Sequence, residues 1–470
     1  MPTKHSLARI LLGVVLAGSG TDLCAWAADA TPSFTLPAYQ KVSLPNGLTL
    51  YLMERHDVPM ITVSCVFPAG AVCDGDRYGL AALTAESLLL GTRGHTKQQI
   101  EEQLDFIGAS CWASASEDAA DLSMSFVNTD QDKVLPLLKE IVCSPRFDGQ
   151  EINKRKRQWL VDLARDKERP AEVIQPYFDR FLFGTHAYGN PVSGTPATVS
   201  RITTGDVKAF YQAHYDPNGS AVAVVGDFNT PAMRQAVTTL LQDWRPKASR
   251  HASLDRPTVR VDRNKVLLVN KDDATETRFL IGGPGVTRDN PDYVEIQVVN
   301  TILGGRFTSW LNDELRVNRG LTYGARSGFR PFKHAGTFAI SSFTKTEHTQ
   351  EALTVSIEVL NRLHTQGVDQ ATLTSAKNYL SGQFPTHYET AGSLAALLTD
   401  MFVYGFDETY VNTFLQRVRD LTPEKAQHVI ETYFPKEHLQ FVLIGKASSI
   451  REAAKAFGEL TEKDIRTPGF

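Results

Sequence analysis

Residues 215–226 read YDPNGSAVAVVG, a turn followed by an apolar run that ends at glycine. The apolar run predicts a buried β-strand over 221–226. A related pattern returns 218 residues later, where residues 433–445 read YFPKEHLQFVLIG. Two copies of one strand signal so far apart indicate two halves built to one plan, not a short-period solenoid.

The elements predicted before each of these strands follow a similar order. Asn46-Gly47 between two apolar runs predicts a hairpin, because both residues tolerate a positive φ. In the first half we expect strands at 40–45, 48–52, 60–67, 110–117 and 120–127, and helices at 79–91, 97–107, 130–144, 149–168, 171–183 and 204–214. In the second half we expect strands at 259–261, 265–270, 278–282, 321–329 and 335–343, and helices at 291–303, 306–317 and over most of 347–432.

These elements predict an α+β fold of two homologous halves, each an antiparallel-rich sheet packed with helices, that face each other across a groove. Residues 245–257 are polar, charged and bounded by prolines, which is typical of a linker. We therefore place one domain at 33–244 and the other at 258–470. A groove between two such halves is the expected binding site.

The composition is that of an ordinary soluble globular chain. The chain has 470 residues, of which 42% are hydrophobic and 22% charged, and this balance excludes a disordered or fibrous protein. A net charge of −4 creates no field that would favour a polyanionic partner, so we expect no nucleic acid to bind.

The first 27 residues predict a signal peptide. Lys4 and Arg9 precede an apolar run at 10–18, and Ala25-Trp26-Ala27 has the small residues that a signal peptidase accepts. The run is too short to cross a bilayer, which takes about 20 residues. We expect an exported chain with no membrane span after cleavage at Ala27.

Four cysteines remain in the mature chain, namely Cys65, Cys73, Cys111 and Cys143. An oxidising compartment permits disulfides, but the spacing gives no connectivity. Buried free thiols are an equal alternative.

Residues 79–92 read GLAALTAESLLLGT and resemble the active-site helix of the insulinase/pitrilysin family, whose inverted zincin motif is H-x-x-E-H. Further segments that match the family in its order are 186–191 (HAYGNP), 194–195 (GT), 215–217 (YDP) and 224–227 (VVGD). The resemblance implies a zinc peptidase fold over nearly the whole mature chain. Here, however, Ala82, Ala85 and Glu86 occupy the positions of the two histidines and the glutamate.

These substitutions remove the chemistry of the motif. In the family, histidines four apart on a helix hold zinc and the glutamate takes a proton from the bound water, whereas alanine does neither. The family's third ligand is a glutamate further along the chain, and Asp162 stands there, 76 residues after Glu86. A hard cation on Glu86 and Asp162 is one interpretation, but two carboxylates make a poor cage, so polar residues on a groove-facing helix are favoured.

The second half keeps more of the family pattern. Residues 303–311 (LGGRFTSWL) and 314–323 (ELRVNRGLTY) look like its second-half signature, in which an arginine and a tyrosine seven residues apart reach toward the scissile carbonyl. Arg316 and Tyr323 match, and a guanidinium and a phenol can donate to a carbonyl or an oxyanion. The alternative is structural, since an arginine complements a helix C-terminus and a strand tyrosine packs. Gly304 and Gly305 either admit a peptide backbone or form a helix–helix turn.

Three functions are consistent with this sequence. The resemblance favours a non-catalytic subunit of a periplasmic zinc peptidase in a Gram-negative cell, paired with a paralogue that carries H-x-x-E-H and the zinc. In that complex this chain would need no cofactor, and Arg316 and Tyr323 would contact the peptide substrate. The alternatives are a peptide-binding or scaffold protein without a peptidase partner, and a stand-alone metallopeptidase with an unusual carboxylate site.

Overall fold

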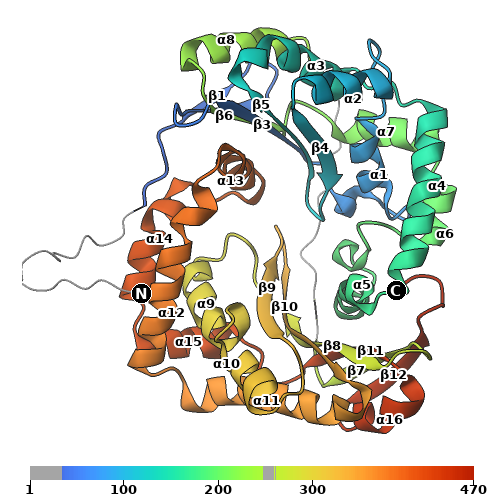
Figure 1. Ribbon diagram of the computed structural model, residues 1–470, viewed down its shortest axis with the longest axis vertical. Coiled ribbons are helices and arrows are strands. Elements are labelled where there is room, and N and C mark those ends of the chain that lie inside the picture. Colours follow the sequence, from blue (N-terminus) through green and yellow to red (C-terminus); the bar gives the residue numbers. More distant parts are fainter. Residues whose placement is uncertain (1–33, 247–258, 260) are drawn as a thin grey trace, which may run out of the picture. The chain divides into compact units, whose positions relative to one another are not determined.

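The first half is built around a six-stranded sheet with the order β1-β2-β6-β3-β5-β4 (Figure 1). The computed structural model describes residues 34–246, 259 and 261–470. The first-half strands are β1 (Gln40–Ser43), β2 (Thr49–Glu54), β3 (Met60–Phe67), β4 (Ser110–Ala115), β5 (Ala120–Val127) and β6 (Ala221–Gly226). Only the β2–β6 pair is parallel, and all six residues of β6 are buried, which explains its continuous apolar run.

The second half repeats this sheet in the order β12-β7-β11-β8-β10-β9. Its strands are β7 (Lys265–Asn270), β8 (Glu276–Pro284), β9 (Ala325–Pro331), β10 (Gly336–Lys345), β11 (Gln440–Gly445) and β12 (Glu459–Asp464). Five strands correspond one to one, with β6 matching β11. The outer edges differ, because β1 is antiparallel to β2 whereas β12 is parallel to β7. The predicted α+β fold of two homologous halves is confirmed.

Helices cover both sheets. Those of the first half are α1 (Leu80–Ser87), α2 (Lys97–Phe106), α3 (Gln131–Cys143), α4 (Gly149–Asp166), α5 (Pro170–Phe183), α6 (Pro196–Arg201), α7 (Thr204–His214) and α8 (Thr230–Leu241). Those of the second are α9 (Tyr293–Asn300), α10 (Trp310–Asn312), α11 (Thr349–Gln366), α12 (Gln370–Gln383), α13 (Ala391–Tyr404), α14 (Glu408–Asp420), α15 (Pro423–Tyr433) and α16 (Ala447–Lys455). No helix in the described residues is both long and apolar enough to cross a membrane.

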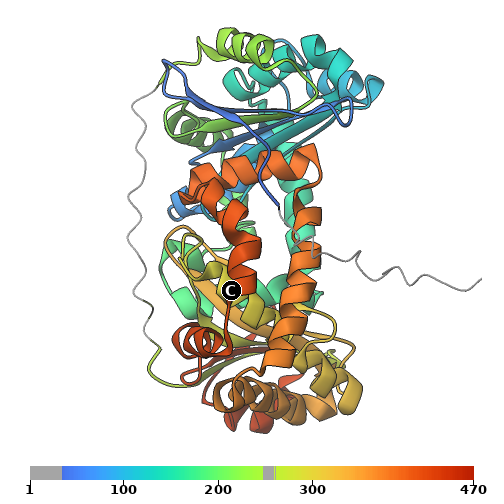
Figure 2. The same cartoon turned by 90° about the vertical axis from the view of Figure 1, so that its left-hand side faces the viewer.

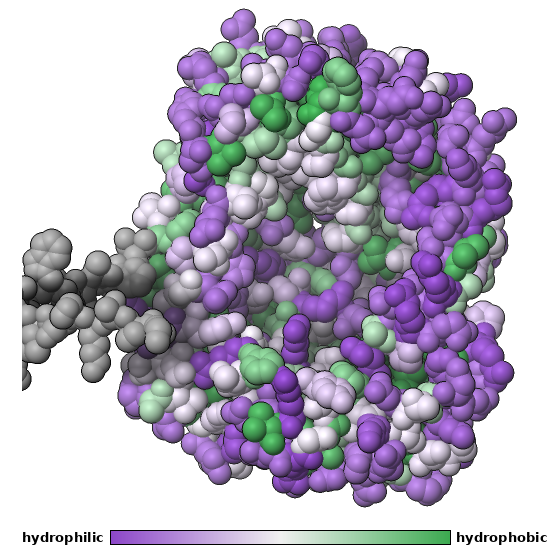
Figure 3. Space-filling model, in the orientation of Figure 1, coloured by the Kyte–Doolittle hydropathy of each residue, from purple (hydrophilic) through white to green (hydrophobic). Residues whose placement is uncertain are grey.

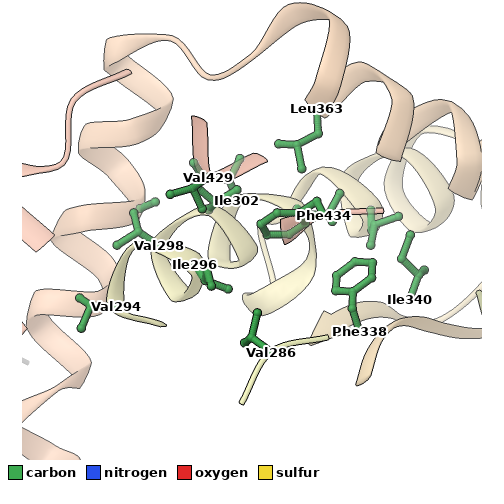
Figure 4. Packing of buried hydrophobic residues seen from close by; sticks show 14 of the residues in the cluster. Val286, Val294, Ile296, Val298, Ile302, Phe338, Ile340, Leu363, Val429 and Phe434 are labelled. Atoms are coloured by element: carbon green, nitrogen blue, oxygen red, sulfur yellow. The ribbon is translucent and has the colours of Figure 1, made fainter. Parts of the chain in front are cut away.

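The core of the second half lies between the sheet and these helices. Figure 4 shows buried side chains of this core, among them Val294, Ile296 and Val298 along α9, Val429 of α15, and Phe338 and Ile340 of β10. Phe338 and Ile340 lie on the sheet side of the core, and both are fully buried. Burying one such side chain contributes about 1.5–3 kcal/mol, so this layer fixes α9 and the segment after it.

The two halves exchange one helix each. Helix α13 of the second half packs on β3 and β6 of the first sheet, and α5 of the first half packs on β8 and β11 of the second (Figure 1). The exchanged helices therefore close both cores, and Figure 2 shows α13 beside the first sheet in a second view. The face drawn in Figure 3 is mainly hydrophilic, with a hollow in its middle.

Polar contacts also join the halves at the tips of two hairpins. Arg330 of β9 donates to Asp179 of α5 at 2.8 Å and to Glu117, in the β4–β5 turn, at 2.7 Å. The Tyr188 hydroxyl donates to Asp118 at 2.6 Å, and the backbone N–H of Lys333 donates to the same carboxylate at 2.9 Å.

Several predicted boundaries differ from the structure. Val259 and Val261 belong to no strand. At the first hairpin only Gly47 has a positive φ, +88°, and the buried Asn46 amide donates to the carbonyls of Leu241 and Trp244. The proposed signal peptide and nearly all of the linker lie outside the described residues.

Candidate functional site

Helix α1 carries the degenerate motif and begins at a buried acidic cap. The Asp74 carboxylate accepts from the backbone N–H groups of Gly79 and Ala81 at 2.8 and 2.7 Å. Burial raises the pKa of Asp74 to about 7, although these N–H groups favour its charged form. The polar loop before the helix is therefore the helix N-terminal anchor.

The two alanines of the motif lie in the core. Ala82 is 7% exposed and Ala85 is fully buried, and both belong to the apolar cluster beneath the first sheet. Helix α1 packs against α7 and β4, and these two methyl groups are buried in the same core. They offer neither a metal ligand nor a proton acceptor.

Glu86 and Asp162 are brought together by a third residue, Arg155 of α4. Arg155 Nε donates to Glu86 Oε2 at 2.5 Å, and its Nη2 lies 3.2 Å from Oε1. Arg155 Nη1 lies 3.5 Å from Asp162 Oδ2. The guanidinium also stacks on Trp159, 4.8 Å from the ring centre. A fixed positive charge from the chain itself thus stands between the two carboxylates.

This arrangement does not fit zinc. The ion takes four ligands from thiolate, imidazole or carboxylate groups, and here two family positions are methyl groups while both carboxylates already bind a cation. Within the described parts of the chain, no cluster of three or more His, Cys, Asp or Glu side chains is placed to hold a metal ion.

Sequence reasoning missed Arg155, although a signal was present. Arg155 precedes Asp162 by seven residues on α4, which is two helical turns, so both side chains lie on one face. A cation two turns before a carboxylate on a helix that faces Glu86 predicts this ion pair. The family's metal-binding motif does not define a position for this cation.

Arg316 and Tyr323 lie in one pocket of about 430 Å³. Tyr323 is 85% exposed, so its hydroxyl is accessible to a ligand. The Arg316 guanidinium stacks on Phe307, 4.4 Å from the ring centre, which leaves the N–H groups at its rim able to donate. The pocket also contains Lys345, His348 and Glu276.

The pocket residues sit on an irregular helix. Arg316 belongs to a π-helical turn, η5 (Asp313–Asn318), and Gly320 ends the segment with a φ of +62°. A second π-helical turn, η4 (Thr301–Gly305), precedes it. Such turns are rare and are frequent at functional sites.

Gly304 and Gly305 have different environments. Gly304 is buried, and a Cβ there would lie 2.2 Å from the backbone nitrogen of Ser327 in β9. Its lack of a side chain thus lets the helix approach the strand. Gly305 is exposed. Contact of either glycine with a peptide stays a prediction.

Three of the cysteines are present as free thiols, namely Cys65, Cys73 and Cys111. Burial raises the pKa of Cys73 and of Cys111 to about 12, and it raises that of Cys65 further. These thiols are therefore protonated and unreactive at neutral pH.

The fold and the site together define a class: a two-halved peptidase-like chain whose metal motif is degenerate. The family description Insulinase (Peptidase family M16) matches residues 51–196, and Peptidase M16 inactive domain matches residues 201–380. The chain therefore belongs to the insulinase family, as the motif resemblance implied.

Some relatives of this chain are named as proteases, and one is named as a non-peptidase homolog. The chain is 24% identical over 406 residues to an uncharacterized zinc protease of Streptomyces coelicolor, covering 83% of this chain and 86% of that protein. It is 23% identical over 447 residues to the non-peptidase homolog YmxG of Helicobacter pylori, covering 94% and 98%.

Among solved structures, a peptidase M16 inactive domain from Pseudomonas fluorescens superposes with a TM-score of 0.82 at 26% identity, covering 87% of this chain and 98% of that one. A protease from Helicobacter pylori has a TM-score of 0.80 at 20% identity, with 87% and 100% coverage, and shows the same fold.

Proposed function

We propose that this chain is the non-catalytic subunit of a periplasmic zinc peptidase heterodimer, whose zinc is held by a paralogue with an intact H-x-x-E-H motif. The observation that carries the proposal is the contrast between two sites of one chain. Arg155 neutralises the degenerate metal site, whereas Arg316 and Tyr323 remain accessible in an open pocket. The name of the Helicobacter pylori relative, a non-peptidase homolog, agrees with a non-catalytic role.

In this complex the pocket holds peptide backbone. The Arg316 guanidinium donates to a peptide carbonyl, and the Tyr323 hydroxyl donates to a second oxygen or to an oxyanion that develops beside the partner's zinc. Each donor lost costs about 1.5–3 kcal/mol when one group is charged, which corresponds to roughly 10- to 100-fold in rate or affinity.

The test is peptidase activity of the chain co-purified with its zinc-motif paralogue. Arg316→Ala is expected to lower activity at least tenfold, and Tyr323→Phe several-fold. Matched controls are Arg319→Ala, whose guanidinium lies near Glu351 and Glu358, and Tyr379→Phe, which lies outside the pocket. If the Arg316 and Tyr323 variants behave like these controls, the assigned roles are wrong.

A peptide-binding or scaffold protein without a peptidase partner is the second candidate. The location of the pocket within one chain favours it, because peptide binding there requires no second subunit. Isothermal titration of an extended peptide into the isolated chain separates the two. Binding that is unchanged by the paralogue, together with no activity in its presence, favours the scaffold.

A further inference from the structure

A second polar pocket lies in the helical layer of the second half, away from Arg316 and Tyr323. It has a volume of about 200 Å³ and is formed where α9, α12 and α14 meet the short turn η7 (Pro385–Tyr388). Its lining includes Arg288, Tyr293, Gln297, Tyr388, Tyr410 and Phe414. A volume below the roughly 300–1,000 Å³ of drug-sized sites suits a single amino-acid residue.

Aromatic rings surround the charge in this pocket. The Arg288 guanidinium carbon lies 4.7 Å from the ring centre of Tyr293, 4.3 Å from that of Phe406 and 4.6 Å from that of Tyr410. Three rings hold the planar group in one orientation through cation–π attraction. The ring faces do not accept hydrogen bonds from the in-plane N–H groups of the guanidinium as a carboxylate would. These N–H groups can therefore still donate to a ligand.

No carboxylate neutralises Arg288 directly. Among the described residues none lies within ion-pairing distance of it, and its buried Nη1 has no hydrogen-bond partner. Arg330 and Arg417, by contrast, each pair with acidic residues. Burial raises the pKa of Asp400 to about 6, and the charge of Arg288 offsets only part of that rise. A half-buried unpaired guanidinium is costly unless a ligand completes it.

Neighbouring groups define what that ligand is. Gln297 Nε2 donates to the Tyr410 hydroxyl at 3.1 Å, which orients that hydroxyl. Burial raises the pKa of the Tyr388 hydroxyl, so it keeps its proton and can donate. Leu380, Phe384 and Phe414 supply an apolar wall. A fork of N–H groups beside phenolic donors and an apolar wall matches a carboxylate attached to an apolar group.

We propose that this pocket binds a carboxylate carried on an apolar residue, as at the C-terminus of a peptide. Arg288 contacts the carboxylate, Tyr388 donates a second hydrogen bond, and the side chain lies against Phe384 and Phe414. This site would be separate from the proposed peptide contacts at Arg316 and Tyr323, so it does not depend on the proposed function.

The test is calorimetric titration of the full chain in a buffer without carboxylates. N-acetylphenylalanine is expected to bind, and N-acetylphenylalanine amide to bind at least tenfold more weakly. N-acetyl-aspartyl-phenylalanine amide separates the two sources of a carboxylate, because tighter binding of this probe assigns the site to an acidic side chain. Equal affinity for the acid and both amides, or no binding of any acid at millimolar concentration, overturns the proposal.

Variants locate the binding on Arg288. Arg288→Met is expected to abolish binding of the acid, and Tyr388→Phe to weaken it several-fold. Arg362→Met is the matched control, because Arg362 stacks on Trp310 at 4.2 Å but lies outside the pocket. Arg316→Ala should leave this binding unchanged. An Arg288→Met variant that binds the acid as tightly as the wild type contradicts the assignment. The comparison of acid with amide on the wild-type chain remains decisive if a variant fails to fold.

Discussion

The replacement of metal chemistry by an ion pair is visible at a single residue, Arg155. Its guanidinium supplies the positive charge that keeps Glu86 and Asp162 together, and it stacks on the Trp159 ring. The sequence predicted the two carboxylates and the two vacant positions from their place in the motif. It did not predict Arg155, because the family motif defines ligands and says nothing about what replaces their ion.

Removal of this cation should destabilise the first half. Arg155→Met leaves two carboxylates that repel each other, and we expect the free energy of unfolding to fall by about 1–2 kcal/mol because the groups are about a third exposed. Urea denaturation measures the change. Arg157→Met, an exposed position on the same helix, is the control, and the additional change Glu86→Gln should restore part of the loss. Equal stability of both arginine variants would contradict the ionic role.

Metal content is a second test of the degenerate site. The purified chain is expected to carry zinc far below one equivalent and to show no chelator-sensitive cleavage, because Ala82 and Ala85 offer no ligand. Elemental analysis together with a peptidase assay of the isolated chain measures both. Stoichiometric metal and cleavage that a chelator abolishes would instead support the stand-alone metallopeptidase.

A pH-dependent contact lies at the end of β2, where His56 bridges two carboxylates. His56 Nδ1 lies 2.5 Å from Asp227 Oδ1 and Nε2 lies 2.9 Å from Glu54 Oε1. The hydrogen bond to Asp227, and then that to Glu54, raises the pKa of His56 above its usual 6.5. The stabilisation of the folded state by protonated His56 is therefore complete below pH 6.5, and it is lost as the pH rises through the pKa of His56 in the folded state. An NMR titration of the imidazole should show this raised value, and a midpoint at or below 6.5 would contradict it.

Among the elements, the irregular helices after β8 differ most from the sequence prediction. The pattern predicted continuous helices at 291–303 and 306–317, whereas the structure has α9 followed by η4, and the short α10 followed by η5. Apolar periodicity reports which face is buried but not whether one extra residue is inserted into a turn. The close approach of Gly304 to β9 depends on a strand that is distant in sequence, so local patterns do not contain it.

The same limit applies to the edge of the second sheet. β12 was not predicted, because Glu459–Asp464 reads ELTEKD and lacks the apolar alternation of a half-buried strand. This segment forms a strand by pairing with β7, and its own residues do not indicate that pairing. By contrast β3, β6 and α7 begin and end at the predicted residues, because their apolar patterns are long or fully buried.

Gly304 offers a test of the π-helical packing. Gly304→Ala places a Cβ 2.2 Å from the Ser327 nitrogen, so the free energy of unfolding is expected to fall by about 1–3 kcal/mol. Gly382→Ala is the control, because this position lies in α12 with no atom within 4 Å of an added Cβ. The control is expected to gain about 0.5–1 kcal/mol from helix propensity. Thermal denaturation of both variants measures the contrast, and a neutral Gly304→Ala would show that η4 can shift.

For the whole molecule, the exchanged helices and the hairpin-tip contacts make the two halves one folding unit. Arg330→Met is expected to lower the free energy of unfolding by about 1–3 kcal/mol, since it leaves Asp179 and Glu117 without their shared cation. Arg326→Met, exposed on the same strand, is the control. Urea unfolding followed by fluorescence should show the shift in a single transition. If the variant instead unfolds in two separate steps, Arg330 is a main link between the halves and the exchanged helices are not.

The exchange of α5 and α13 also has a consequence for biosynthesis. Strand β6 is complete at Gly226, but the helix that covers its face, α13, ends only at Tyr404. At about 5–20 residues per second, a nascent chain needs roughly 10–40 s to make the intervening segment. During that interval an apolar sheet surface has no cover from its own polypeptide. A holdase chaperone that shields this surface until the second half emerges would therefore increase the yield of the native protein.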